Sequence, residues 1–179
     1  MSTLSVTTLQ GLASSPTPTT IEVQSGHKLS GAAGSITTPG MILQVVQTHV
    51  TAYSTTSSSS NSSTGLTVTI TPKFSSSKVL ITGNMNSCHS NAATRYARYE
   101  LFKGGSFLVY IHALVGYLQN DVGYNTDFSY SYLDSPNTTS ATTYDLQWSA
   151  HNGGSSHFNN YGSSNNTTRS TITAMEVAQ

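Results

Sequence analysis

Charged side chains are scarce in this sequence. Only 8% of its 179 residues are Asp, Glu, Lys or Arg, and the seven basic and seven acidic side chains cancel. No net field steers such a chain toward a polyanion, so we expect neither nucleic-acid binding nor attraction to an anionic membrane. Lys and Glu, common helix formers, are few, whereas Ser and Thr together supply roughly a third of the residues. This composition favours strands and turns over helices.

Cysteine and long apolar runs are nearly absent. The single Cys88 excludes an internal disulfide, and a lone Cys is more often a small strand hydrophobe than a nucleophile. No stretch approaches the roughly 20 apolar residues of a membrane-spanning helix. The first nine residues lack the basic and apolar regions of a signal peptide. We therefore expect a protein that is made in a cytoplasm and inserts into no membrane.

Residues 1–38 are predicted to form an extended N-terminal assembly arm and spacer. Two short strand-like runs carry its apolar side chains, namely Leu4, Val6, Leu9, Ile21 and Val23. A Ser- and Pro-rich stretch separates the runs, and a Gly-, Ser- and Ala-rich stretch follows them. Neither run can bury a core alone. The head domain is therefore expected to span residues 39–179.

The head is predicted to be all-β. About eight strand-like segments separated by turn-rich loops follow Met41, the spacing expected of an antiparallel β-sandwich or jelly roll. In the clearest segment, strict alternation places Leu66, Val68 and Ile70 on one face. Paired glycines at 104 and 105 predict a hairpin turn. The apolar last strand, residues 170–178, is expected to be packed, either near a symmetry axis or as a central strand of a monomeric sandwich.

Aromatic residues fall into two groups. Those that alternate along predicted strands are expected to fill the core or a subunit interface: Tyr96, Tyr99, Tyr130, Tyr132, Tyr144 and Trp148. Others lie in predicted loops beside Asn and Ser, where flat rings and neutral hydrogen-bonding groups suit contact with a carbohydrate or protein surface. The candidate contact residues are Tyr117, Tyr124, Asn125, His157 and Tyr161.

No catalytic or metal-binding pattern stands out. The six histidines show no short ligand spacing, so no metal and no cofactor are expected, although one His from each chain meeting on a trimer axis remains open. Asp121 and Asp127 share a region, but they suit turn capping at least as well as acid/base catalysis. We expect no enzymatic activity and assign no catalytic residue.

Several separated segments resemble a module of fibre-type virion proteins of aquatic bacteriophages. They are residues 39–48 (PGMILQVVQT), the serine-rich loop, 65–72 (GLTVTITP), 75–78, 103–105, 132–136 and 170–176. Residues 1–10 similarly resemble the start of small structural proteins of such phages. The resemblance spans residues 39–179. Proteins of this type are usually longer before the head, which argues against a long free-standing tail fibre.

The resemblance implies a homotrimeric β-sandwich on the virion surface. The arm would bind other virion proteins, such as a tail or major capsid protein, and the head would face outward toward a host-surface glycan or protein. The first alternative is a capsid decoration protein that stabilises the shell. A capsular depolymerase and a cellular lectin are less favoured alternatives.

Overall fold

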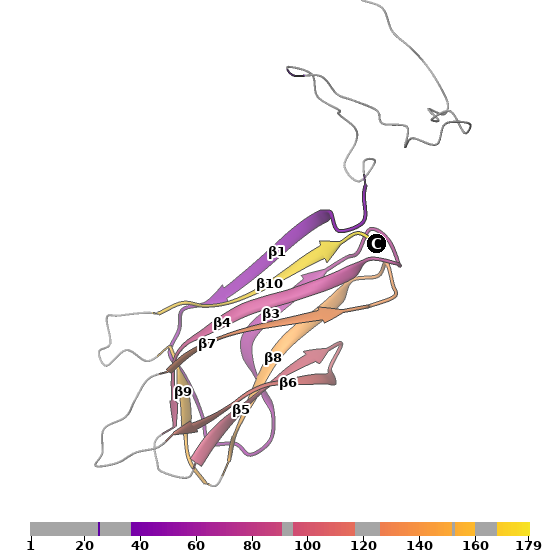
Figure 1. The fold of residues 1–179 in the computed structure, drawn as a ribbon. Helices are drawn as coiled ribbons and strands as arrows, with labels where there is room; N and C mark the ends of the chain where they lie inside the picture. Colours follow the sequence, from indigo (N-terminus) through magenta and orange to yellow (C-terminus); the bar gives the residue numbers. More distant parts are fainter. Residues whose placement is uncertain (1–24, 26–36, 91–94, 117–125, 152, 160–167) are drawn as a thin grey trace, which may run out of the picture. The chain divides into compact units, whose positions relative to one another are not determined.

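The computed structural model describes residue 25 and residues 37–90, 95–116, 126–151, 153–159 and 168–179 (Figure 1). Every regular element in these ranges is a strand. The ten strands are β1 (Ile42–Val50), β2 (Ser54–Thr56), β3 (Ser62–Ile70), β4 (Lys78–Ser90), β5 (Arg95–Lys103), β6 (Ser106–Gly116), β7 (Thr126–Asp134), β8 (Thr142–His151), β9 (Ser156–Phe158) and β10 (Ser170–Val177). The arm residues Leu4, Val6, Leu9, Ile21 and Val23 lie outside the described residues.

The strands form two antiparallel sheets that make a β-sandwich, as the sequence predicts. The first sheet has the order β1-β10-β4-β7, and the second has the order β3-β8-β5-β6. Apart from the β5–β6 hairpin, successive long strands alternate between the two sheets, and this is the strand order of a jelly roll. At a bulge in β4, where Ser87 has a φ of +50°, the first sheet continues into β9 and β2.

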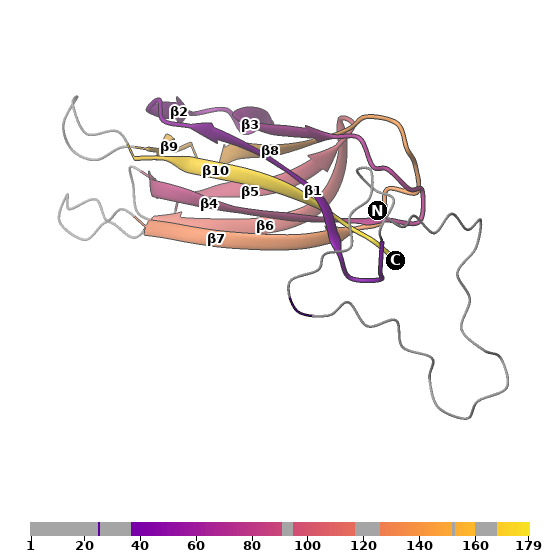
Figure 2. The same ribbon diagram turned by 90° about the horizontal axis from the view of Figure 1, so that it is seen from above.

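The winding gives the sandwich two different ends. The start of β1 and the end of β10 lie together, where Gly40 N donates to Ala178 O (2.9 Å) and Ala178 N donates to Met41 O (2.9 Å). The turns β3–β4, β5–β6 and β7–β8 belong to this terminal end. The strand ends that flank residues 91–94, 117–125 and 160–167 belong to the opposite end, which we call the loop end (Figure 2).

The core lies between the sheets and follows the period-two pattern of the strands. Leu66, Val68 and Ile70 are buried together, as the sequence predicts. So are four of the six strand aromatics: Tyr99, Tyr130, Tyr144 and Trp148. Tyr132 is half-buried against the core. Tyr96 lies elsewhere, stacked on His151 of the neighbouring strand at a ring distance of 4.8 Å.

The sequence-based strand pattern differs from the structure in one region. The sequence predicts a loop around His157, but this residue lies in β9, which pairs with β2 and with the end of β4. Phe158 explains why this short strand is held: its buried ring packs edge-on against Trp148 at 5.0 Å. The predicted hairpin turn is confirmed, since Gly104 and Gly105 both have positive φ angles.

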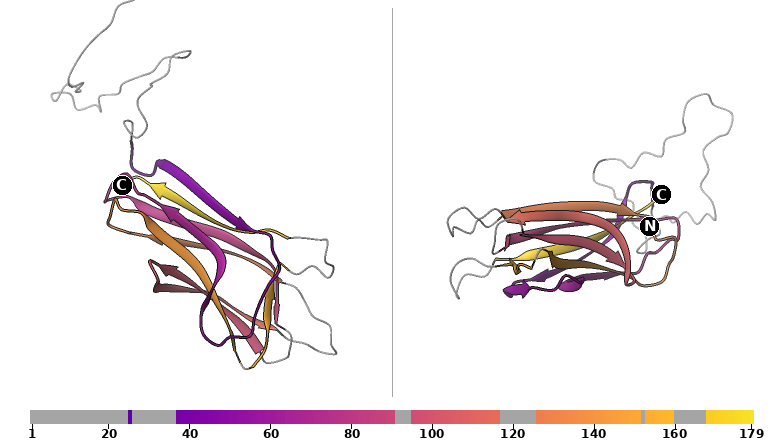
Figure 3. Two further views of the ribbon diagram at one scale, coloured as in Figure 1. Left: turned by 180° about the vertical axis from the view of Figure 1, so that it is seen from behind. Right: turned by 90° about the horizontal axis from the view of Figure 1, so that it is seen from below.

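The last strand occupies a central position. β10 pairs with β1 on one side and with β4 on the other, and Figure 3 (left) shows yellow β10 beside indigo β1. β10 is therefore a central strand of its sheet. Ile172 and Ala174 point inward and are fully buried. Met175 and Val177 alternate with them and therefore lie on the outer face.

Candidate interaction surfaces

His157 is the one predicted contact residue that the structure describes, and it lies at the loop end on β9. Its ring stacks on Tyr53 with an interplanar angle of 15°, and its Nδ1 lies 2.5 Å from the Tyr53 hydroxyl. Tyr53 is exposed. The pair therefore presents a flat aromatic surface with polar edges, the kind of surface that suits a carbohydrate or protein contact.

The other four contact candidates, Tyr117, Tyr124, Asn125 and Tyr161, lie outside the described residues. Their place in the chain is nevertheless informative. Residues 117–125 join β6 to β7, and residues 160–167 join β9 to β10. Both connections leave from strand ends at the loop end, where His157 also lies. The described strand ends on either side of these connections therefore lie at the same end of the sandwich as His157.

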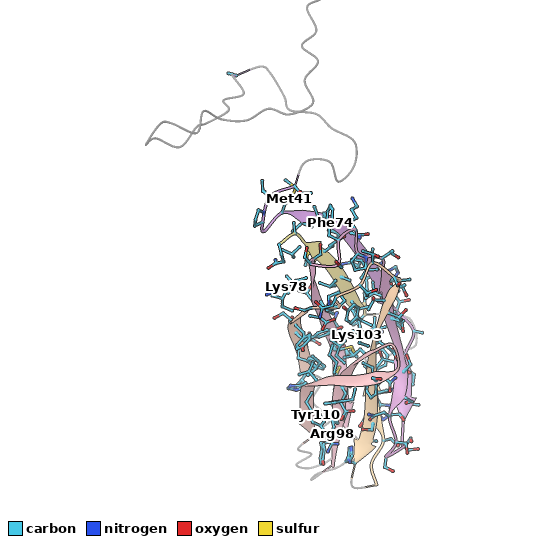
Figure 4. The ribbon with its side chains drawn as sticks, turned by 90° about the vertical axis from the view of Figure 1, so that its right-hand side faces the viewer. Met41, Phe74, Lys78, Arg98, Lys103 and Tyr110 are labelled. Carbon is cyan, nitrogen blue, oxygen red and sulfur yellow. The ribbon has the colours of Figure 1, made fainter. Side chains whose placement is uncertain are left out.

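Aromatic side chains also gather on the outer face of the β5–β6 hairpin. We call Phe102, Phe107 and Tyr110 the aromatic patch. Phe107 contacts Phe102 edge-on at 6.0 Å and Tyr110 at 4.8 Å. Phe107 is 50% exposed and Tyr110 is 61% exposed. The Arg98 guanidinium lies 5.3 Å from the Tyr110 ring centre, and Figure 4 labels both residues away from Met41 and Phe74.

The outer face of the other sheet carries an apolar row across all four strands. Val45 of β1 pairs with Met175 of β10, Met175 with Leu80 of β4, and Leu80 with Leu133 of β7. These four residues are called the apolar row. Val45 is 57% exposed and Leu133 is 50% exposed. Ile42, 53% exposed, and its partner Val177 extend the apolar surface toward the terminal end.

The rest of that face is polar. The next register level toward the loop end consists of Gln47, Thr173, Thr82 and Ser131. Gln47 Nε2 donates to Thr173 Oγ1 at 2.8 Å, so this row is already hydrogen-bonded. Exposed apolar side chains therefore occupy only the half of the face nearest the terminal end, rather than being scattered singly over the surface.

Neither surface was predicted from the sequence, although each leaves a signal. Strict alternation of apolar and polar residues predicts one solvent-exposed polar face. Several strands instead carry consecutive apolar residues: Val45-Val46, Val79-Leu80-Ile81, Tyr132-Leu133 and Ala174-Met175. Since neighbours along a strand point to opposite faces, such runs predict apolar residues on both. The aromatic patch is harder to find, because the bulges in the β5–β6 pairing interrupt the alternation.

The carboxylates of the described residues have structural partners. Asp127 Oδ1 accepts from Ser87 N at 2.7 Å, so it binds the bulge of β4 and does not cap a turn of its own segment. Asp121 lies outside the described residues. Asp145 accepts from Ser63 at 2.7 Å, from Thr67 at 3.0 Å and from Gln147 at 2.9 Å. These contacts organise the outer face of the second sheet.

The Cys88 thiol and the grouping of possible metal ligands bear on reactivity. Burial raises the pKa of the Cys88 thiol to about 12, so the thiol stays protonated near neutral pH. In the part of the chain that the structure describes, no three His, Cys, Asp or Glu side chains come together as metal ligands. No helix among the described residues has the length and apolarity needed to cross a membrane.

The chain matches no protein-family model, and no curated protein matches it significantly.

Proposed function

We propose that this chain is a structural protein of a phage particle: a homotrimeric surface appendage that residues 1–38 anchor to other virion proteins. The β head would project outward and contact the host surface. The head is an all-β sandwich with the jelly-roll strand order, which agrees with the fold that the resemblance to fibre-type virion proteins implies. The chain is not proposed to be an enzyme.

The observation that carries the proposal is the polarity of the sandwich. The chain enters the head at Gly40, beside Ala178, at the terminal end. His157 lies at the loop end on β9, and the described strand ends that flank residues 117–125 and 160–167 lie at the same end. An arm held by a particle protein would therefore leave the loop end free to meet another surface. Three copies would strengthen a weak contact through avidity, without a deep pocket.

Low charge fits this role. A surface rich in hydroxyl groups and almost free of net charge gives little nonspecific electrostatic attraction to cells or nucleic acid. Specificity would then depend on aromatic and neutral polar groups, such as the stacked pair Tyr53 and His157.

The test is to locate the protein on purified particles of the phage that encodes it. Particles are labelled with an antibody raised against residues 41–179 and imaged by electron microscopy, with antibody pre-absorbed on the purified protein as the control. Label on the tail supports an appendage used in attachment. Label distributed over the capsid supports the alternative, a decoration protein. Absence of specific label on particles that infect normally would overturn both.

A further inference from the structure

We infer that the loop end binds a neutral saccharide, with one sugar ring lying on the exposed face of Tyr53. This inference rests on the proposed function and deepens it, because it names the class of host-surface molecule and the side chain that meets it. The sequence pattern does not single out Tyr53. Only the structure brings this residue against His157, 104 positions away in the chain.

The Tyr53 ring has one covered face and one open face. It stacks on the His157 ring with the two ring centres 5.7 Å apart and an interplanar angle of 15°. The Tyr53 hydroxyl also lies 2.5 Å from His157 Nδ1, so a hydrogen bond holds the pair in addition to stacking. Tyr53 is nevertheless 52% exposed. Because His157 covers one face of the ring, the exposed area belongs to the other face and to the edges.

The buried side chain of Asn159 holds the segment that leads to Tyr53. Its Nδ2 donates to Val50 O at 2.9 Å and to Ala52 O at 3.2 Å. Its Oδ1 accepts from Ser170 Oγ at 2.8 Å, which ties the amide to β10, and only 3% of Asn159 is exposed. A ring that is already held in place loses little conformational freedom when a ligand packs on it, and this favours binding.

The surroundings of Tyr53 carry no ionic side chain. Residues 50–61 and 153–159, which build this part of the loop end, contain no Asp, Glu, Lys or Arg. The exposed Thr55 pairs in register with His157, so its hydroxyl lies on the same face of the β2–β9 pair. Phosphates and carboxylates are bound mainly by Arg, Lys and other charged donors. A neutral ligand therefore suits this site better than an anionic one.

A saccharide has the chemistry that this site offers. The carbon-bound hydrogens of a sugar ring form an apolar face, which packs on the electron-rich face of an aromatic ring. The hydroxyl groups around the sugar both donate and accept hydrogen bonds, as the hydroxyls of Ser and Thr do. Tyr53 supplies the ring face. Thr55 and the exposed serines that follow β2 supply neutral hydrogen-bonding groups beside it.

A protein partner suits the site less well. A standard protein interface buries roughly 800 Å² on each partner and has an apolar centre. Among the described residues of the loop end, Tyr53 is the one large hydrophobic side chain that is exposed. A single ring can bind one sugar, but it cannot form the centre of a protein interface. The weak binding that one ring provides would be strengthened by the three copies of the proposed trimer.

The test is saturation-transfer NMR on the full chain with neutral oligosaccharides. These are released from the surface polysaccharide of cells that the phage infects and are separated from charged oligosaccharides by ion exchange. Saturating the aromatic protons of the native protein should transfer signal to the carbon-bound protons of a sugar ring. Tyr53→Ala should abolish this transfer and weaken binding about tenfold, the usual scale for loss of an aromatic anchor.

Two further variants show which part of Tyr53 acts. Tyr53→Phe keeps the ring and should keep most of the transfer, because stacking rather than the hydroxyl carries the contact. Tyr110→Ala removes a ring of similar exposure from the outer face of the second sheet and should bind as the native protein does. Far-UV circular dichroism checks that each variant keeps the native fold. All three replacements are at exposed positions, so the fold should be retained.

The outcomes separate this inference from the proposed function. Equal binding by the native protein and Tyr53→Ala would overturn the assignment to Tyr53. Binding of the charged fraction alone would overturn the neutral class, and binding of neither fraction would overturn saccharide recognition. Antibody label on the tail together with no saccharide binding would leave the proposed function standing without this inference. Saccharide binding by a protein that is absent from particles would do the reverse.

Discussion

Tyr144 donates a hydrogen bond from its hydroxyl to Asp134 Oδ2 at 2.7 Å, and this bond joins the two sheets near the terminal end. Tyr144 belongs to β8 of the second sheet, and Asp134 ends β7 of the first. Lys103 of β5 completes the group, with its Nζ 3.0 Å from the same carboxylate oxygen. A buried carboxylate thus has both a neutral donor and a cation from the opposite sheet.

Replacing Tyr144 with Phe should lower the free energy of unfolding by about 1–2 kcal/mol, because a bond to a buried charged acceptor is lost while the ring remains. Urea denaturation measures the change. Tyr110→Phe serves as the control, since it removes a hydroxyl from an exposed ring and should have little effect. Equal stability of the two variants would show that the bond to Asp134 contributes nothing.

The stability of the fold should depend on pH through the Glu176 carboxyl. Burial alone would raise the pKa of its carboxyl, but hydrogen bonds from Gln44 and from the backbone N–H groups of Lys73 and Phe74 outweigh burial and lower the pKa below 4.5. A carboxyl with a lowered pKa in the folded state stabilises the fold above its unfolded pKa, and this contribution is lost as the pH falls through the folded pKa.

The native protein should therefore lose stability as the pH falls below about 4.5, the ordinary pKa of a glutamate. Glu176→Gln should be less stable at pH 7 by about 1–3 kcal/mol and should depend less on pH in the acid range. Chemical denaturation at pH 7 and at several lower pH values measures both effects. Asp145→Asn is a matched control on the other sheet. If Glu176→Gln lost stability at low pH as the native protein does, other carboxyl groups would be responsible for that loss.

The fold could be predicted from particular residues, but its surfaces could not. Leu66, Val68 and Ile70 alternate cleanly with threonines, so their burial follows from the period of a strand. Strand residues within a loop-like stretch were harder to predict. Ser62 and Ser63 lie in the serine-rich stretch but belong to β3, because β8 supplies their pairing partners. No local sequence pattern reveals such a partner. β9 was missed for the same reason.

The surfaces depend on register between distant strands. Val45 and Leu133 share one row only because β10 and β4 lie between β1 and β7 in a fixed pairing. Sequence reasoning gives the face of each residue within its strand but not the strand order. The apolar row therefore became visible only once the pairing was known. Of the candidate contact residues, which rest on composition, the structure describes His157 alone, and it lies at the loop end.

Gly83 should not tolerate a larger residue. A Cβ atom at this position would overlap the Thr171 carbonyl oxygen and the Tyr130 ring, because Tyr130 lies across β4 where Gly83 has no side chain. Gly83→Ala should destabilise the fold by about 1–3 kcal/mol, the usual cost of overpacking a core. Thermal unfolding measures it, with Thr82→Ala on the outer face as control. Unchanged stability would show that the sheet can shift at this point.

The loop end should carry host contact if the proposed function holds. Tyr124→Ala with Tyr161→Ala should reduce adsorption of the purified protein to host cells severalfold, because aromatic side chains dominate many binding surfaces. Phe74→Ala removes an exposed aromatic ring at the terminal end and is the matched control. Flow cytometry of cells incubated with fluorescent protein measures adsorption, and sedimentation velocity checks that each variant keeps the native mass. If the double tyrosine variant and Phe74→Ala lost adsorption equally, recognition would not be confined to the loop end, because a contact confined there cannot depend on Phe74.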